Sequence, residues 1–289
     1  MYLSADRIAV VDKAVQDTFE QSSIAWQAIP HWDTGDRGQF RVRSDNASAP
    51  EVNEDKLSPP ISPGDSLKLE ANTVRFAVTV AQAIAPTPDA LLAAVITRTV
   101  QLAGRVDSKV IAVLRAGAKD PVNVLAATGA TPPIQMLLNA LIDARAQLEK
   151  FGYRAPSCLL TDTEGLKALN YLQSGLSDFQ ALLDAANINS VYRVDQLRSD
   201  KGPTPAKETE PDSANGQFKG RLLLLGRRQR IPHGGAAATS PGEEPADLAV
   251  SVPPSVEVVG ETATGDIEMS VRIRFAPRLT DLYGVVNVV

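Results

Sequence analysis

The longest regular pattern of apolar positions runs from residue 87 to residue 118. Apolar side chains recur there every three or four residues, which is the spacing of one face of an α-helix rather than of a strand. The positions that share this face are Leu91, Leu92, Val95, Ile96, Leu102, Ala103, Val106, Val110, Val113 and Leu114. Thr87 is a suitable N-cap, Pro88 suits the first turn, and Gly117 can end the helix. At ~1.5 Å per residue the helix is about 45 Å long, so we expect it to act as a spine.

A shorter helical stripe precedes the spine at the amino terminus. Ser4 is a suitable N-cap for a helix whose apolar face consists of Ile8, Val11, Val15, Thr18 and Phe19. Beyond this helix Pro30 and two glycines interrupt helical order, while Trp26 and Trp32 supply large apolar surfaces. Because the segment cannot bury these surfaces alone, we expect an arm anchored by the two tryptophans. It docks either on a neighbouring subunit or on the spine of its own chain.

From residue 39 the pattern changes to an alternation of period two, which predicts strands. Phe40 and Val42 alternate with arginines in the first strand. The apolar positions of the returning strand are Leu67, Leu69, Val74, Phe76, Val78 and Val80. The segment between them is rich in Ser, Asp, Pro and Glu, so we expect an exposed connection. The result is an extended hairpin without a core of its own, whose partner is expected to be another subunit.

A second structural unit is predicted from residue 121 to residue 251. Its pattern indicates a helix at 133–151, a buried strand at 155–162, helices at 163–172 and 177–188, and strands at 189–197 and 220–227. Gly152 can end the first of these helices, and Thr161 or Thr163 can cap the second. The alternation of strands and helices is typical of a compact α/β or α+β unit.

The carboxy-terminal part of the chain is rich in predicted strands, at 247–252, 255–261, 266–275 and 282–289. The third alternates most clearly, with Ile267, Met269, Val271, Ile273 and Phe275 on one face. The last strand is apolar on both faces, so we expect it to be central or buried.

Composition and charge narrow the function classes. The 289 residues carry a net charge of −5 and are 44% hydrophobic, which predicts a globular protein without a basic groove for nucleic acid. No apolar run is long enough to span a membrane. A single cysteine, Cys158, allows neither an intramolecular disulfide nor a zinc–thiolate cluster, and its apolar neighbours predict a buried thiol.

Catalytic chemistry is not indicated. The only histidines, His31 and His233, each follow an Ile-Pro pair and lie beside no candidate nucleophile, so we expect no catalytic, cofactor or metal site. The most concentrated charge is the cluster of Arg227, Arg228 and Arg230. It is interpreted as a surface patch at the end of a strand, with intersubunit salt bridges or contact with an anionic lumen as the alternatives.

The order of these elements resembles the major capsid protein fold of tailed phages, the Hong Kong 97 type, which encapsulin shell proteins share. The most family-like pieces are DALLAAVITRTVQLAGRVDSKVIAVLRAG, FGYRAPSCLLTDTEGLKALNYL, DLAVSVPPSVEV and DIEMSVRIRFAPRLTDLYGVVNV. The resemblance implies an α+β fold. Its parts are an amino-terminal arm (1–38), an E-loop hairpin (39–80), a P-domain with the spine helix (81–120) and the terminal strands (252–289), and an A-domain (121–251).

The resemblance also implies a structural protein rather than an enzyme. Many copies would assemble through pentamers and hexamers into an icosahedral phage head that encloses double-stranded DNA without sequence-specific contacts. The alternative is an encapsulin-type compartment that encloses cargo proteins. The chain lacks the GPxGW-like and GGD-like stretches of peroxidase-loading encapsulins, which favours the phage head.

The resemblance also implies scaffold, portal or decoration proteins as partners. It does not imply contact with a membrane. The expected location is the virion, assembled in the host cytoplasm, or a cytoplasmic compartment for an encapsulin. The candidate intersubunit contacts are Trp26, Trp32, Arg41, Arg43, Lys68, Arg75, Arg227, Arg228 and Arg230.

Overall fold

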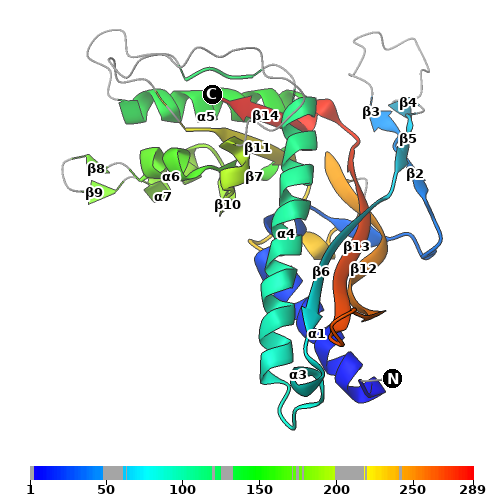
Figure 1. Ribbon diagram of the computed structural model, residues 1–289. Helices are drawn as coiled ribbons and strands as arrows, with labels where there is room; N and C mark the ends of the chain where they lie inside the picture. The colour runs from blue at the N-terminus through cyan, green and yellow to red at the C-terminus, as the bar shows by residue number, and fades with distance from the viewer. Residues whose placement is uncertain are drawn as a thin grey trace.

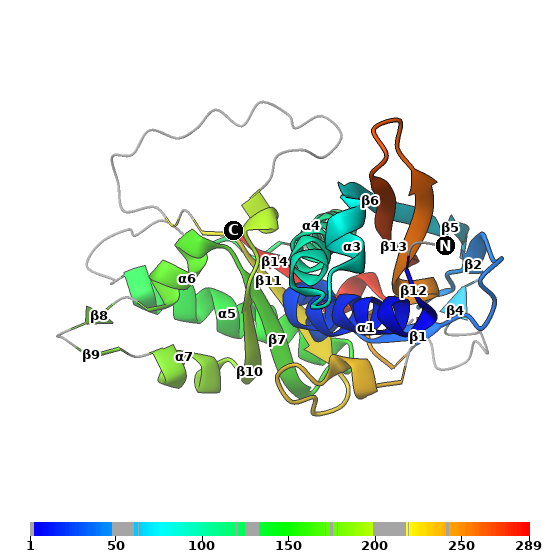
Figure 2. The ribbon, with the colours of Figure 1, turned by 60° about the horizontal axis from the view of Figure 1, so that its bottom comes forward.

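The computed structural model describes residues 3–47, 61–62, 64–118, 121–124, 133–170, 172–173, 176–177, 179–198, 218, 220–240 and 243–289. Figure 1 shows helix α4 (Asp89–Gly117) as the long vertical element of the molecule. In Figure 2, with the lower end of α4 turned forward, this helix lies between two β-sheets. The mixed α+β class is as predicted.

Helix α4 confirms the predicted spine, with differences at its start and on its outer face. Its N-cap is Pro88, which makes no side-chain hydrogen bond, so the expected capping by Thr87 is wrong. Ile96 and Val113, expected on the buried face, are 43% and 36% exposed. The face that packs is narrower than the full set of apolar positions, because neighbouring residues on a helix point about 100° apart. That face includes one charged residue, Asp107.

Two glycines end helices for different reasons. Gly152, which follows α5 (Pro133–Lys150), has a φ of +87°, the left-handed conformation that favours glycine at a helix end. Gly117 is the last residue of α4, and a Cβ atom added there would lie 2.0 Å from Cδ2 of Leu279. Both predicted helix ends are confirmed, and at Gly117 the close packing of Leu279 leaves no room for a side chain.

The amino-terminal segment packs against α4 of its own chain. Helix α1 (Ala5–Ser22) is capped by Ser4, whose hydroxyl accepts a hydrogen bond from the Arg7 backbone N–H at 3.3 Å, as predicted. Its buried residues Val11, Val15 and Phe19 belong to the same apolar core as α4, and a short helix, α2 (Ile24–Ala28), follows. Of the two docking arrangements left open by the sequence, the structure contains the one on the spine of the same chain.

The first sheet lies against α4 and has the strand order β1-β12-β13-β6. Its strands are β1 (His31–Asp33), β12 (Ala246–Glu261), β13 (Ile267–Leu279) and β6 (Glu70–Val78). Strand β1 runs parallel to β12, and the other neighbours are antiparallel. The two strands predicted at 247–252 and 255–261 form one strand, β12, because register shifts on both sides of Val252 accommodate Pro253 and Pro254.

The predicted hairpin at 39–80 divides into a hairpin and a sheet strand. Strand β2 (Arg41–Arg43) pairs with β5 (Ser66–Lys68), and β3 (Asn46–Ala47) pairs with β4 (Ile61–Ser62). Beyond them β6 leaves the hairpin and pairs with β13, so the expectation of a hairpin up to residue 80 is wrong. Val80 begins a helix, α3 (Val80–Ile84), that was not predicted. The centre of the predicted polar connection, residues 48–60 and 63, lies outside the described residues.

The second sheet has the strand order β10-β7-β11-β14. Its strands are β10 (Ile188–Arg193), β7 (Ala155–Thr161), β11 (Leu222–Arg227) and β14 (Val285–Val288). Helices α5, α6 (Thr163–Leu169) and α7 (Phe179–Ala185) accompany it, with the small ribbon β8 (Leu172–Gln173) and β9 (Leu176–Ser177) and three 3₁₀ turns, η1 (Asp195–Arg198), η2 (Ala236–Ala238) and η3 (Leu282–Gly284). The cap of α6 is Asp162, so the predicted caps Thr161 and Thr163 are wrong.

Strands β7 and β11 are buried on both faces, which explains their continuous apolar sequences. Cys158 and Leu160 face the core shared with α4, whereas Leu159 faces a second core built around α5. Strand β14 is buried as predicted, but it stands at the end of the sheet order rather than in its centre. Residues 285–288 therefore join the sheet of the predicted A-domain, across the boundary that the sequence placed at residue 252. The division into domains stays a prediction.

Candidate subunit contact surfaces

Trp26 is packed inside the subunit. Its ring meets Phe19 edge-on, with ring centroids 5.3 Å apart, and stacks on the imidazole of His31 at 3.6 Å. Only 7% of Trp26 is exposed. The same burial lowers the pKa of His31 from 6.5 to about 4. Contact between Trp26 and a neighbouring subunit stays a prediction, since these contacts are all made within one chain.

Asp107 of α4 fixes the segment that carries Trp26. Its carboxylate accepts hydrogen bonds from the Ser23 hydroxyl at 2.7 Å and from the backbone N–H groups of Ile24 and Ala25 at 3.1 and 3.0 Å. Burial raises the pKa of Asp107, and these hydrogen bonds oppose the increase. Sequence reasoning missed this residue, although an aspartate in the middle of an apolar helical face is a visible sign of a buried acceptor.

Trp32 lies half-buried where the hairpin meets the first sheet. Its indole N–H donates to Oδ1 of Asp247 at 3.2 Å, and the guanidinium of Arg278 lies 4.8 Å from its ring centroid. Arg278 and Asp247 form an ion pair, and the Asp247 side chain is fully buried. The sequence did not identify Asp247 or Arg278, because neither lies in a motif and Trp32 is 215 residues away from Asp247.

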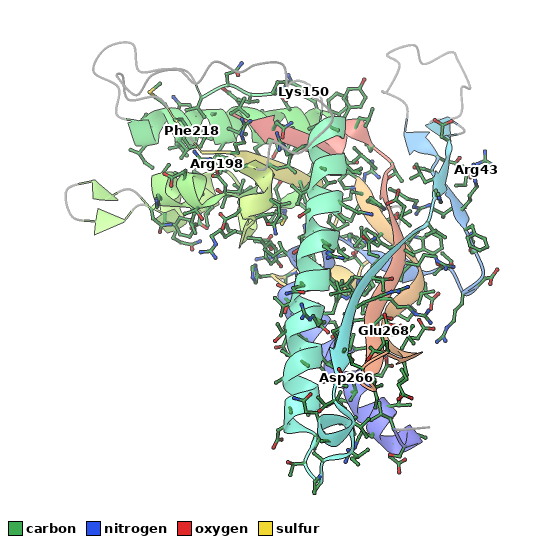
Figure 3. The ribbon with its side chains drawn as sticks, viewed as in Figure 1. Arg43, Lys150, Arg198, Phe218, Asp266 and Glu268 are labelled. Carbon is green, nitrogen blue, oxygen red and sulfur yellow. The ribbon has the colours of Figure 1, made fainter. Side chains whose placement is uncertain are left out.

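The hairpin gathers three of the predicted cationic contacts. Arg41 lies directly opposite Lys68 in the β2–β5 pairing, an arrangement of like charges that costs stability unless an acidic group lies nearby. Arg43, on the outer side of the hairpin in Figure 3, pairs with Asp45 at 2.7 Å. Hydrogen bonds from the Gly64 backbone and from Arg43 lower the pKa of Asp45. The structure thus brings Arg41, Arg43 and Lys68 together on one exposed element.

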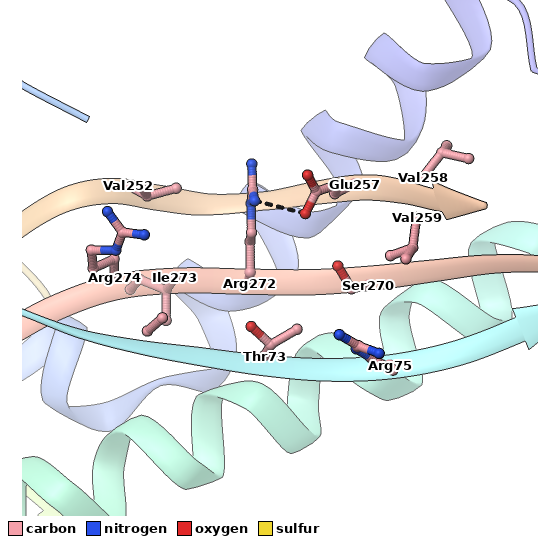
Figure 4. A pocket seen from close by; sticks show the side chains of 11 residues that line it. Thr73, Arg75, Val252, Glu257, Val258, Val259, Ser270, Arg272, Ile273 and Arg274 are labelled. Atoms are coloured by element: carbon pink, nitrogen blue, oxygen red, sulfur yellow. Dashed lines mark ion pairs between the residues drawn. The ribbon is translucent and has the colours of Figure 1, made fainter. Parts of the chain in front are cut away.

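Arg75 lies on the outer face of the first sheet, away from α4. Figure 4 shows it beside a pocket of about 270 Å³ that is also lined by Arg272, Arg274 and Glu257. Arg75 is paired with Glu268 at 3.5 Å and Arg272 with Glu257 at 2.6 Å. Within the described chain the Nε atom of Arg272 has no hydrogen-bond partner. That atom is buried, so the accessible cationic side chain beside the pocket is that of Arg75, which is 70% exposed.

Arg227 is a core residue, so its interpretation as part of a surface patch is wrong. Every residue of β11 is buried, and Arg227 is only 2% exposed. Its Nη2 donates to the carbonyl of Ala28 at 3.1 Å, which ties the end of α2 to the second sheet. Burial raises the pKa of the neighbouring Cys158 thiol and of Glu244, while the charge of Arg227 opposes both increases. The two arginines that follow it in sequence have different surroundings.

Arg228 makes contacts within the subunit, and Arg230 is exposed. The guanidinium of Arg228 lies 4.6 Å from the ring centroid of Tyr153 and 3.3 Å from Oδ2 of Asp281. Tyr153 also donates its hydroxyl to Asp281 at 2.6 Å, and burial raises its pKa above the usual range. Of the three predicted arginines, Arg228 and Arg230 are exposed and Arg227 is buried.

The described residues contain no group of three or more His, Cys, Asp and Glu side chains that could hold a metal ion. Over the same residues no helix has the length and apolar character needed to cross a membrane. His31 stacks on Trp26, and His233 stacks on Tyr192 with ring centroids 4.2 Å apart. Cys158 is a free, buried thiol, as predicted.

No protein-family model matches the chain, and no curated protein matches its sequence. Solved structures do match along almost its whole length. A virus-like particle from Pyrococcus furiosus has a TM-score of 0.63 at 12% identity and covers 98% of this chain and 99% of its own. A phage-related protein from Bordetella bronchiseptica has a TM-score of 0.63 at 12% identity, with coverage of 97% and 96%.

An encapsulin complex from Synechococcus elongatus is also similar, with a TM-score of 0.52 at 11% identity and coverage of 90% of this chain and 84% of its own. The mature capsid of bacteriophage PhiM1 has a TM-score of 0.52 at 10% identity, with coverage of 92% and 86%, so the fold is shared by a phage capsid and an encapsulin shell. It is the Hong Kong 97 fold, which confirms the resemblance inferred from the sequence.

Proposed function

We propose that this chain is a structural shell protein, and that many copies assemble into an icosahedral phage head that encloses double-stranded DNA. The observation that carries the proposal is the shared fold. Two similar structures, a virus-like particle and a phage-related protein, match 98% and 97% of this chain. A fold that extends over the whole chain leaves the described residues without a separate catalytic unit.

Exposed apolar side chains support assembly. Phe40 on the hairpin is 65% exposed, and Val258 and Val259 near the end of β12 are 40% and 44% exposed. On the outer face of α4, Ile96 and Val100 are 43% and 48% exposed and stand one helical turn apart. Because Ile96 and Val100 are neighbours on one helical face, they form a small contiguous apolar patch that a neighbouring subunit can cover.

Charged side chains on the hairpin and outer sheet face point to the same conclusion. Arg41 and Lys68 face each other across the β2–β5 pairing, and the side chain of Arg75 is 70% exposed on the outer face of the first sheet. An acidic surface of a neighbouring copy would stabilise these cationic side chains. We propose these residues, with Arg43, as intersubunit contacts.

The proposal includes assembly through pentamers and hexamers, with DNA held in the lumen without sequence-specific contacts. Scaffold, portal and decoration proteins are its further partners, and the virion, assembled in the host cytoplasm, is its location. A cytoplasmic encapsulin-type compartment with protein cargo is the second candidate, favoured by the similarity to the Synechococcus elongatus complex.

The contents of native particles separate the two candidates. Particles isolated from the natural source would be treated with nuclease, opened, and analysed for nucleic acid and for copurifying proteins. Nuclease-protected double-stranded DNA is the expected result. Particles that hold a defined protein cargo and no DNA would contradict the phage head and support the compartment.

Deletion of residues 47–63 tests the assembly half of the proposal. The hairpin contributes few residues to the two main cores, so the variant is expected to keep the melting temperature of the subunit while losing shells. The measurements are thermal unfolding and electron microscopy of the same preparation. Intact shells from the deleted chain would show that the hairpin is not an assembly element.

A further inference from the structure

Two arginines of β13 hold the base of the hairpin. Arg274 donates from Nη1 to the carbonyl of Arg37 at 3.1 Å, and its guanidinium lies 5.1 Å from the ring centroid of Phe40. Arg278 donates from Nη1 to the carbonyl of Arg43 at 3.0 Å. Residues four apart on a strand lie on the same face and about 13 Å apart. The segment from Arg37 to Arg43, which includes the first strand of the hairpin, is therefore held at two points by one face of β13.

Arg278 is itself held in a single orientation. Its Nε and Nη2 atoms donate to the two carboxylate oxygens of Asp247 at 2.7 and 2.5 Å, and Trp32 both stacks on the guanidinium and donates to the same carboxylate. The Arg278 side chain is 15% exposed and that of Asp247 is fully buried. A bidentate, stacked guanidinium cannot rotate freely. Its Nη1 amino group is consequently aimed at the Arg43 carbonyl.

The second strand of the hairpin continues directly into β6, which pairs with β13 from Glu70 onward, and the other attachments are small. Val42 and Leu69 form a minor apolar cluster with Ala249 and Ala276 of the sheet. The hydrogen bond from the Leu69 backbone N–H to the Phe40 carbonyl, at 2.8 Å, closes the hairpin on itself rather than fixing it to the sheet. The continuation into β6 thus fixes the second strand of the hairpin, whereas the first strand depends on the arginine contacts.

We propose that Arg278, oriented by Asp247 and Trp32, is a positioning residue that sets the direction in which the hairpin leaves the sheet, and that this direction holds assembled shells to one size. The second half rests on the proposed function. The pairs from residue 41 to residue 47 extend about 20 Å, so a tilt of ~10° at the base moves their far end by about 3 Å. Packed interfaces do not absorb such a displacement without a change in the angle between subunits.

Distance measurements between two spin labels test the positioning role in the full chain. Ser66→Cys on the hairpin and Ser108→Cys on α4 place labels at exposed positions in a Cys158→Ala background. An excess of unlabelled chains removes distances between copies. Arg278→Lys keeps the positive charge but cannot form the two parallel hydrogen bonds to Asp247. The distance distribution is therefore expected to become roughly twofold wider. A distribution of unchanged width would overturn the proposal.

Arg272→Lys is the matched control, because Arg272 lies on the same face of β13 but pairs with Glu257 of β12. It is expected to leave the distribution unchanged. A second variant, Arg278→Gln combined with Asp247→Asn, removes both charges and leaves no unpaired buried carboxylate. It is expected to widen the distribution like Arg278→Lys, and it keeps the test decisive if the single variant fails to fold.

Particle diameters from cryo-electron microscopy test the consequence for assembly. Arg278→Lys is expected to give mixed diameters or open sheets, and Arg272→Lys shells of one diameter. A widened distance distribution together with shells of one diameter would overturn the size-setting role. If the unmodified chain forms no shells, the proposed function fails, while the spin-label distances still decide whether Arg278 positions the hairpin.

Discussion

Asp107 holds the amino-terminal segment against α4 through hydrogen bonds to Ser23, Ile24 and Ala25. It stands among the apolar residues of α4, is 3% exposed, and accepts two backbone N–H groups at the start of α2. A buried carboxylate persists because its hydrogen bonds offset the cost of desolvation. The same donors would be left without an acceptor if the side chain were apolar.

Asp107→Leu is therefore expected to lower the free energy of unfolding by about 3 kcal/mol, since each unpaired buried donor costs ~1–3 kcal/mol. Urea unfolding of the subunit measures the change. Asp89→Asn, at an exposed position on the same helix, is the matched control and should change stability by less than ~1 kcal/mol. Equal stability of the Leu variant and the unmodified chain would refute the capping role.

His31 predicts a particular pH dependence. Its folded-state pKa of about 4 lies below the unfolded value of 6.5, so the unfolded chain binds more protons between these two pH values. The contribution of His31 to stability is complete above pH 6.5 and is lost as the pH falls towards about 4. Denaturant midpoints measured across this range for the unmodified chain and for His31→Phe should converge as the pH falls. Parallel curves would contradict the burial of a neutral imidazole.

At the scale of elements, the spacing of apolar residues predicted helices and strands that depend on local sequence. It missed strand pairings that depend on a distant part of the chain. Strand β13 and helix α4 follow from their spacing alone. The departure of β6 from the hairpin does not, because a strand has the same alternation whichever strand it pairs with. Helix α3 carried a readable signal, the capping box of Thr79 and Gln82, which the alternation through Val78 and Val80 obscured.

The candidate contacts divide in the same way. Exposed hairpin cations such as Arg41 were recognisable from alternation, whereas Arg227 and Arg230 look alike in sequence and differ completely in burial. The cluster of Trp32, Asp247 and Arg278 joins distant parts of the chain, and no local sequence pattern predicts such a contact. Long-range polar contacts of this kind were therefore beyond reach of the sequence.

The amino-terminal segment supplies a prediction at the element scale. Trp26→Ala removes the ring that packs against Phe19 and His31, and is expected to lower subunit stability by ~3–5 kcal/mol. Val10→Ala, at a 51% exposed position on α1, is the control and should be nearly neutral. Thermal unfolding and shell yield per folded chain are measured together. A normal melting temperature with failed assembly would instead show that Trp26 contacts a neighbouring subunit.

At the scale of the whole molecule, the fold is retained although identity to the similar structures is only 12%. The long helix α4 lies between two sheets in a core that both share, a second core lies between the second sheet and α5, and the hairpin projects beyond the first sheet (Figure 1). Cores of this kind tolerate extensive apolar substitution provided that pattern and volume persist. Identity of the contents, DNA or protein, depends instead on surface chemistry that the fold does not determine.

Mass measurement of the purified, expressed chain tests the central claim most directly. An icosahedral shell requires about 60 copies or more, which for a chain of 30.8 kDa is roughly 1.8 MDa. Light scattering coupled to size-exclusion chromatography, with cryo-electron microscopy of the same peak, is expected to show closed particles of at least this mass. A stable, folded monomer of 30.8 kDa that remains monomeric at high protein concentration would contradict the account.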